Sequence, residues 1–173
     1  MKPAEPQPVK YFIGALYSDV DLLGQAILLC EQRIGEIDLR SEDFPFDVTS
    51  YYDDEMGNPI SRSIFSFDRL LSPGELARLK VICNQIEDEL KVAGSRRVNL
   101  DIGYLDLHKL VLASAKYNGQ KIYLEQGIYA DPTLYFEKGQ FHPFENTFPD
   151  FKSNTYLDFF LEIRNTYKAQ LKT

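Results

Sequence analysis

The chain has 173 residues, of which 44% are hydrophobic and 26% charged, and its formal net charge is −7. A chain of this length buries enough surface to fold without a disulfide or a metal, and its acidic balance argues against general binding to DNA or RNA. Its apolar runs are too short to span a bilayer, and residues 1–8 lack the apolar core of a secretory signal, so we expect a soluble, cytoplasmic protein.

The N-terminal part of the chain predicts a strand followed by a helix. Residues 1–8 (MKPAEPQP) are polar and proline-rich, which predicts a disordered tail. Val9–Tyr17 is rich in β-branched and aromatic residues and is predicted to be a buried strand. Asp19 supplies a helix start, apolar residues then recur at helical spacing, and Gly35 is a natural stop.

A long irregular segment follows this helix. A short strand is expected near Glu36–Leu39, and after it comes a loop rich in Asp, Pro and Gly. Residues 44–57 of that loop also carry several large aromatic side chains. Loops of this length in a compact domain are usually functional or packed on their own side chains.

The middle of the chain predicts a second strand–helix–strand unit. Ile60–Asp68 is typical of a strand. Ser72 and Glu75 form a capping box around a proline, and the apolar stripe that follows predicts a helix ending near Gly94. Arg97–Ile102 alternates between apolar and polar residues and is predicted to be a strand.

The C-terminal part predicts a helix, a β-meander and a final helix. Gly103 is expected to let the backbone turn sharply, and Asp106–Lys116 has apolar residues at helical spacing. The remaining expected elements are strands at Gln120–Tyr129, Thr133–Glu137 and Gln140–Phe144, and a helix after Ser153 or Asn154. We therefore predict one α+β domain over residues 9–173, with a ferredoxin-like βαββαβ core, these extensions and a single mixed sheet.

Several familiar chemistries have no motif in this sequence. It contains no G-x-x-x-x-G-K-[ST] phosphate loop, no G-x-G-x-x-G, no H-E-x-x-H and no G-x-S-x-G. His108 and His142 stand apart from each other and from the cysteines, so a zinc site is poorly supported. Cys30 and Cys83 lie at apolar positions of predicted helices and are expected to be buried core thiols.

The strand at Arg97–Ile102 carries the strongest candidate site. Alternation places Arg97, Asn99 and Asp101 on one face of this strand, with Tyr104 just beyond its end. A carboxylate and a carboxamide there could ligate Mg²⁺ or bind a polar ligand. The alternative is that both side chains cap the following helix, and that Arg97 and Asp101 form a structural ion pair.

The aromatic loop 44–57 carries the second candidate site. Its acids include Asp47 and Glu55, which could coordinate a divalent cation, and Tyr51 and Tyr52 could stack on a sugar or a base. The segment lacks the pattern of a calcium loop. The alternative is an acidic surface loop pinned by its aromatic residues. A third candidate, Asp150, follows Phe148–Pro149 and is also explained as turn or cap chemistry.

Four separated segments resemble one bacterial family. They are PFDVTSYYDDEMG (45–57), RRVNLDIGYL (96–105), KIYLEQGIYADPTL (121–134) and TFPDFKS (147–153), and the opening PVKYFIGALYS is similar too. Together they resemble the family called domain of unknown function 4416. The family pattern has proline at Ile102 and glutamate at Asp131. Since no activity is established for this family, the resemblance implies no catalytic residues, but the candidate residues lie within its motif segments.

Two function hypotheses follow from these residues. The first is a small-molecule binding protein or enzyme that takes a small, phosphate-containing anion, with Mg²⁺ or another divalent cation as the candidate cofactor. Asp101 is its candidate catalytic residue, and the candidate ligand-binding residues are Asp47, Tyr51, Tyr52, Glu55, Arg97, Asn99 and Tyr104. The second is a non-catalytic interaction module that docks a protein partner, or a second copy in a homodimer, through loop 44–57.

Overall fold

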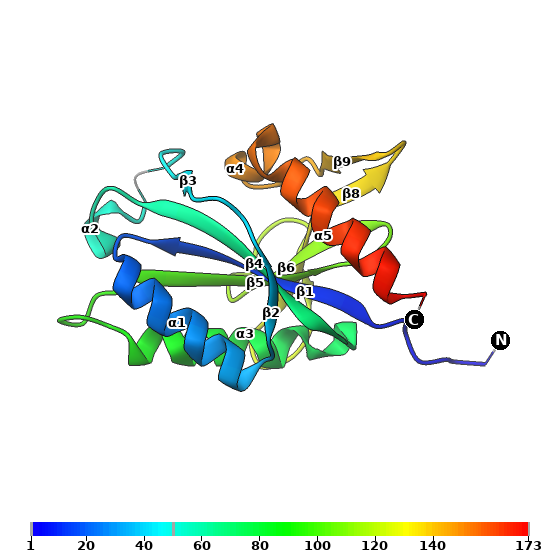
Figure 1. Ribbon diagram of the computed structural model, residues 1–173, viewed down its shortest axis with the longest axis horizontal. Helices are drawn as coiled ribbons and strands as arrows, with labels where there is room; N and C mark the ends of the chain where they lie inside the picture. Colours follow the sequence, from blue (N-terminus) through cyan, green and yellow to red (C-terminus); the bar gives the residue numbers. More distant parts are fainter. Residues whose placement is uncertain (1, 50, 173) are drawn as a thin grey trace.

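The computed structural model describes residues 2–49 and 51–172. Met1 of the predicted tail, Ser50 of the predicted aromatic loop and Thr173 at the end of the predicted domain lie outside the described residues. Helices α1 and α3 lie on one side of the central strands, and α4 and α5 lie on the other (Figure 1). No helix in the described ranges has the length and apolar character needed to cross a membrane.

The described residues form an α+β fold around one sheet. The strands are β1 (Val9–Tyr17), β2 (Ile37–Arg40), β3 (Phe44–Pro45), β4 (Ser61–Leu71), β5 (Val98–Leu105), β6 (Lys109–Ser114), β7 (Ile122–Tyr123), β8 (Tyr129–Glu137) and β9 (Gln140–Pro143). The α-helices are α1 (Val20–Arg33), α2 (Asp53–Met56), α3 (Leu76–Glu89), α4 (Pro149–Lys152) and α5 (Leu157–Gln170). Short 3-10 helices η1 (Pro73–Glu75) and η2 (Asn154–Tyr156) precede α3 and α5.

The sheet is antiparallel, so the prediction of a mixed sheet is wrong. Its strand order is β2-β4-β1-β5-β6-β8-β7, with β3 on β4 and β9 on β8. Each of these neighbouring pairs is antiparallel. The helical connection from β1 to β2 does not make them neighbours, because β4 lies between them and runs the opposite way.

The helix start at Asp19 agrees with its predicted signal, whereas the capping box predicted at Ser72 and Glu75 forms only in part, because the Glu75 carboxylate accepts from Arg78. The Asp19 carboxylate accepts hydrogen bonds from the backbone N–H groups of Asp21 and Leu22 at 2.9 and 3.0 Å. The Ser72 hydroxyl accepts one from Gly74 N at 3.3 Å. Both side chains therefore satisfy N–H groups that a helix start leaves free.

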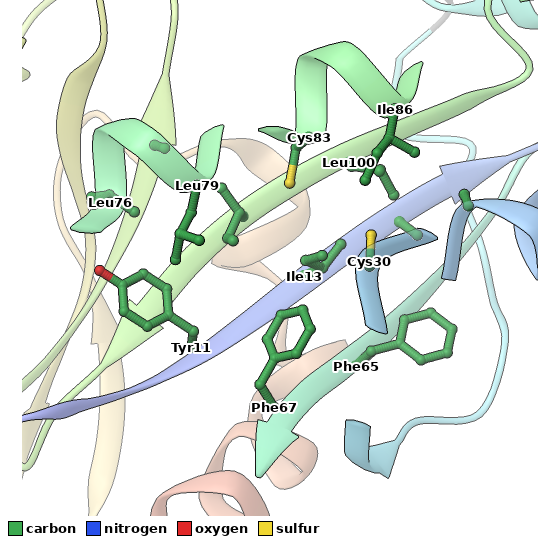
Figure 2. Packing of buried hydrophobic residues seen from close by; sticks show 14 of the residues in the cluster. Tyr11, Ile13, Cys30, Phe65, Phe67, Leu76, Leu79, Cys83, Ile86 and Leu100 are labelled. Atoms are coloured by element: carbon green, nitrogen blue, oxygen red, sulfur yellow. The ribbon is translucent and has the colours of Figure 1, made fainter. Parts of the chain in front are cut away.

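The first hydrophobic core lies between the sheet and helices α1 and α3. Figure 2 shows Ile13 and Leu100 from the strands facing the sulfur atoms of Cys30 and Cys83 from the two helices. Both thiols are free and buried, which confirms the sequence prediction. Burial raises the pKa of Cys30 to about 12 and raises the pKa of Cys83 well above its ordinary value. Both cysteines are therefore packing residues.

The second hydrophobic core lies on the opposite face of the sheet. Phe12, Leu105 and Leu110 pack there against helices α4 and α5. Phe160 of α5 meets Phe12 edge-on, with 5.2 Å between ring centroids, and stacks on Phe151 of α4 at 5.9 Å. Helices α4 and α5 therefore pack on this face of the sheet.

The helix predicted at Asp106–Lys116 is wrong, because this segment is the turn and second strand of a hairpin. The Asp106 carboxylate accepts hydrogen bonds from the backbone N–H groups of His108 and Lys109, which closes the turn before β6. Leu110 and Val111 are buried on opposite sides of β6. A strand that is apolar on both faces cannot be told from a helix by periodicity.

Two further sequence expectations also need correction. Gly103 makes no turn but lies inside β5, where a Cβ atom would be 2.6 Å from Val111 O and 2.9 Å from Phe12 Cζ. Only Ile122–Tyr123 and Tyr129 of the strand predicted at Gln120–Tyr129 are in strands. The residues between them form a turn in which Gly127 has a φ of 75°. Such turns need φ values that glycine adopts easily.

Candidate functional site

Strands β5 and β6 separate from each other beyond Gly103. They pair only where Gly103–Leu105 faces Leu110–Leu112. Further along, β5 pairs with β1 as far as Val98, and β6 pairs with β8 as far as Ser114. Because each strand keeps its outer neighbour, the sheet opens between β5 and β6.

A cleft of about 760 Å³ lies at this opening. Its lining comes from the loop after β3, from β4, α3 and β5, from β6 and the loop after it, and from β8 and α4. Pockets of roughly 300–1,000 Å³ hold drug-sized ligands. A second hollow, beside Tyr104 and Tyr167, measures about 220 Å³, so the larger cleft is the candidate site.

Side chains of α3 occupy the free edge of β5 inside the cleft. Lys80 Nζ donates to Leu100 O at 2.8 Å, and the Glu87 carboxylate accepts from Leu100 N at 2.8 Å. Lys80 and Glu87 are almost completely buried, with side-chain exposures of 8% and 5%. Because the backbone groups of Leu100 are already paired, this edge is a poor template for an added peptide strand.

Arg62 of β4 is a cation in the lining of the cleft that binds two carboxylates. Its guanidinium donates to Asp150 of α4 at 2.5 Å and to Asp101 of β5 at 3.3 Å. The same group lies over three aromatic rings, and the distances to their centroids are 5.1 Å for Phe46, 5.4 Å for Phe151 and 5.6 Å for Tyr156. These contacts hold a buried charge between elements that are distant in sequence.

The two carboxylates that bind Arg62 differ in their access to the cleft. The Asp150 side chain is 6% exposed, whereas the Asp101 side chain is 27% exposed. Burial raises the pKa of Asp150 against the opposing effect of Arg62. Burial, assisted by the charge of Asp101, raises the pKa of Tyr52 to about 12. Asp101 is therefore the member of the pair that a ligand in the cleft can reach, beside a neutral Tyr52.

Arg96 joins the aromatic loop to β5 and α3. It makes two hydrogen bonds to Glu55, at 2.7 and 2.8 Å, and contacts both Glu87 and Asn99 Oδ1 at 3.0 Å. Hydrogen bonding from Arg96 lowers the pKa of Glu55, which keeps this carboxylate ionised. Arg96 thereby fixes the orientation of the Asn99 amide, whose oxygen is committed to the guanidinium.

Two donors of the cleft-lining residues have no hydrogen-bond partner among the described residues. They are Nε of Arg62 and Nδ2 of Asn99, and both residues are more than nine-tenths buried. Leu16 of β1 pairs with Arg62 on one side and with Asn99 on the other, so the two residues project from the same sheet face. Buried donors are normally paired, so these two nitrogens are exceptions among the residues that line the cleft.

A second buried ion pair, between Lys121 and Asp131, lies on the β6–β8 side of the cleft. Lys121 Nζ is 2.9 Å from Ser114 Oγ and 3.5 Å from the Asp131 carboxylate, and it lies 5.5 Å from the centroid of the Phe148 ring. Burial raises the pKa of Asp131 against the opposing effect of Lys121. Lys121 is 9% exposed, so its charge is held at the cleft wall rather than in bulk solvent.

The charge of the cleft differs from that of the whole chain. Its lining contains five basic residues, Arg62, Lys80, Arg96, Lys116 and Lys121, and four acidic residues, Glu87, Asp101, Asp131 and Asp150. The lining is therefore formally +1, whereas the chain is −7. Enclosed charges attract ligands of the opposite sign, so this lining, unlike the acidic chain as a whole, does not carry a net negative charge that would repel an anion.

The mouth of the cleft is bridged by Tyr51 and Lys116. Lys116 Nζ donates to Tyr51 Oη at 2.8 Å and lies 4.6 Å from the centre of the Tyr51 ring. The hydrogen bond from Lys116 lowers the pKa of the Tyr51 phenol. This contact joins the loop after β3 to the loop after β6 across the cleft.

Replacing Lys116 with methionine is expected to raise the pKa of Tyr51 back toward the ordinary tyrosine value, because the ammonium stabilises the phenolate. Spectrophotometric titration from pH 8 to 11 measures this, and subtracting the titration of a Tyr51→Phe protein isolates the one phenol. Lys168→Met, on the exposed side of α5, is the matched control and leaves the titration unchanged. A Tyr51 titration that is identical with and without Lys116 would show that the bridge is absent in solution.

The structure brings four of the predicted site residues to the cleft and leaves four outside its lining. Asp101, Asn99, Tyr51 and Tyr52 line it. Outside the lining, the Glu55 carboxylate accepts a hydrogen bond from Arg96 at 2.8 Å, and Arg97 donates to Met56 O at 2.7 Å. Asp47 is exposed, and Tyr104 packs against Tyr11 on the other side of the sheet.

Sequence reasoning did not select several residues that line the cleft. Arg62 alternates with Ile60 and Ile64 on one face of its predicted strand, and a charge between two apolar residues is a signal for a buried, partnered group. Lys80 and Glu87 are separated by two helical turns and so share one face of α3. Asp131 lies in one of the motif segments, whereas Asp150, the third candidate from the sequence, does line the cleft. Lys121 has no distinguishing local signal.

The fold and the cleft define an α+β protein with a polar, aromatic-rimmed cavity at an opening in an antiparallel sheet. The family model described as domain of unknown function (DUF4416) matches residues 7–167, and the chain therefore belongs to this family. No curated protein and no solved structure matches the chain significantly.

Proposed function

We propose that this protein binds a small anionic molecule in the cleft between β5 and β6. The observation that carries the proposal is a cleft with five basic residues in its lining, together with the unpartnered buried donors Arg62 Nε and Asn99 Nδ2 on two lining residues. Oxygen atoms of a phosphate or carboxylate accept hydrogen bonds from such donors, and these charge-assisted bonds are stronger than neutral ones. The occupied edge of β5 also supports a small molecule over an inserted peptide.

The arrangement of the aromatic loop supports this proposal over a protein interaction module. Met56 is completely buried against Leu16, Phe46 and Ile60, and Tyr52 packs on the same cluster. Tyr51 and Tyr52 contact each other, with 4.9 Å between ring centroids, and both line the cleft. Flat, exposed aromatic patches are the surfaces that suit docking of a protein partner.

If the cleft is catalytic, Asp101 is the residue we assign to act on the ligand. It is more exposed than the other carboxylate bound to Arg62, and it lines the cleft together with Tyr51 and Tyr52 of the aromatic loop. Among the described residues, no group of three or more His, Cys, Asp or Glu side chains is arranged to hold a metal ion. Mg²⁺ often binds one or two carboxylates together with substrate phosphates. A divalent cation would therefore arrive with a phosphate ligand.

We also propose that β1, α1, β2, β4, α3 and β5 form a ferredoxin-like unit. Their chain order and the strand order β2-β4-β1-β5 support it, because a split βαβ arrangement places its strands in this way. A cytoplasmic location is likewise our proposal, supported by the two free buried thiols. Strands β6 to β9 are an addition to this unit, and the cleft lies at the junction.

A thermal-shift screen with phosphorylated metabolites and dicarboxylates, each with and without Mg²⁺, tests the binding proposal. A ligand at a hundred times its dissociation constant is expected to stabilise the protein by about 2.7 kcal/mol and to raise the midpoint by several degrees. Asn99→Ala is expected to weaken that ligand by about tenfold, because it removes a donor to a charged group.

The matched control is Asn165→Ala, which removes an exposed asparagine on α5. We expect it to leave the ligand-induced shift unchanged. A ligand that shifts the wild-type and Asn99→Ala proteins equally would bind elsewhere and would contradict this assignment. The absence of any shift across the screen would count against the proposal and would favour the interaction module.

A further inference from the structure

We infer that the ligand of this cleft carries a planar, unsaturated ring in addition to its anionic group. In this arrangement the ring lies at the mouth, against Tyr51, Tyr117 and Phe148, and the anionic group lies deeper, toward Arg62 and Asn99. The inference rests on the proposed function and specifies its ligand class.

The first observation is the exposure of large aromatic side chains at the mouth. Tyr51 is 62% exposed, Tyr117 is 77% exposed and Phe148 is 48% exposed, and all three line the cleft. They come from three separate segments, namely the loop after β3, the loop after β6 and the residue before α4. Aromatic faces that gather from distant segments around one opening offer stacking surfaces to a flat molecule.

The second observation is that these rings are held in place although they are exposed. Tyr51 is fixed by Lys116 and by an edge-on contact with Tyr52, with 4.9 Å between ring centroids. Tyr117 contacts the Tyr129 ring at 5.6 Å. A ring that is already positioned loses little freedom when a ligand stacks on it, and this reduces the cost of binding.

The third observation is that lysines stand beside two of the rings. Lys116 lies over Tyr51 and Lys121 lies over Phe148, at 4.6 and 5.5 Å from the ring centroids. Ring and cation are thus paired on both sides of the cleft. The two lysines attract a molecule that stacks on these rings while its anionic group lies deeper, toward Arg62 and Asn99.

The fourth observation is the volume. An inorganic anion fills only a small part of a cleft of about 760 Å³, whereas this volume is in the range that encloses a whole drug-sized molecule. A nucleoside monophosphate has the required parts, since every nucleobase offers a flat π-face and the phosphate supplies the charge. We therefore use nucleoside monophosphates as probes for the ring-bearing class.

The test compares probes that share a phosphate and differ in the ring. Isothermal titration calorimetry with adenosine, guanosine, cytidine and uridine monophosphates, with ribose 5-phosphate and with inorganic phosphate gives six dissociation constants. We expect at least one nucleotide to bind about tenfold tighter than ribose 5-phosphate, because stacking on aromatic side chains strengthens binding by this order. Tyr117→Leu is expected to remove most of that difference and to leave the binding of ribose 5-phosphate unchanged.

Tyr123→Leu is the matched control, because Tyr123 is 58% exposed and lies outside the lining of the cleft. It is expected to preserve the preference for the nucleotide. Equal affinity for ribose 5-phosphate and all four nucleotides would overturn the ring inference and leave the anion proposal standing. Failure of every probe to bind would count against both the ring inference and the proposal that the cleft binds an anion. A preference that survives Tyr117→Leu, Tyr51→Leu and Phe148→Leu would place the ring elsewhere and would also overturn the inference.

Discussion

Replacing Arg62 with leucine is expected to lower the free energy of unfolding by about 3–5 kcal/mol, because breaking a buried ion pair leaves an uncompensated charge. Asp150 is 6% exposed and its carboxylate is 2.5 Å from Arg62, so it would remain buried with its main partner gone. The three rings around the guanidinium would also lose their cation. Urea denaturation followed by circular dichroism measures the change.

Two further variants make this prediction specific. The double variant Arg62→Leu with Asp150→Leu is expected to regain much of the lost stability, since an apolar replacement of a whole buried pair is often tolerated. Arg69→Leu, at an exposed position of the same strand, is the matched control and is expected to change stability by less than about 0.5 kcal/mol. An Arg62→Leu protein as stable as Arg69→Leu would contradict the burial of this charge.

Replacing Gly103 with alanine is expected to destabilise the protein by about 1–3 kcal/mol, the usual cost of overpacking a filled interior. The new Cβ would lie 2.6 Å from Val111 O and 2.9 Å from Leu112 Cδ2 and Phe12 Cζ. Val111 O belongs to the backbone of β6, so β5 and β6 must move apart to remove this steric clash. Because β5 and β6 last pair at Gly103 before the cleft opens, this substitution also changes the shape of the cleft.

Gly24→Ala is the matched control for this substitution. Gly24 lies inside α1, and nothing is within 4 Å of a Cβ placed there. Alanine is expected to stabilise the protein at that position by about 0.5–1 kcal/mol, because glycine in a helix interior loses more freedom on folding. The two glycine variants should therefore change the urea midpoint in opposite directions. Equal effects would show that the close approach of β5 and β6 at Gly103 is absent in solution.

The elements with strong local signals could be predicted from the sequence. The apolar run of β1, the caps at Asp19 and Ser72 and the apolar stripe of α3 each define their element within a few neighbouring residues. The hairpin at β6 could not be predicted in this way, because Leu110 and Val111 satisfy both the helical and the strand period. The antiparallel sheet depends on which strands become neighbours, and local patterns do not contain that information.

The candidate site was predictable only where a polar residue had no evident role in folding. Asn99 and Asp101 were found because alternation places them together on β5, and the same alternation puts Tyr104 on the other face. Arg97 was chosen as the partner of Asp101, whereas the structure gives that contact to Arg62. Arg62 also binds Asp150, which is 88 residues away in the sequence. Contacts across such distances follow from the register of the sheet rather than from spacing along the chain.

The most direct test of anion binding in the cleft is an NMR titration with the ligand that gives the largest thermal shift. It follows the side-chain signals of the two unpartnered donors, Arg62 Nε–H and the Asn99 amide. We expect both signals to move with the same dissociation constant as the backbone amides of Lys116 and Lys121, and the signals of Asn165 to stay fixed. Saturation of the protein with both donor signals unchanged would contradict the claim that this cleft binds the anion.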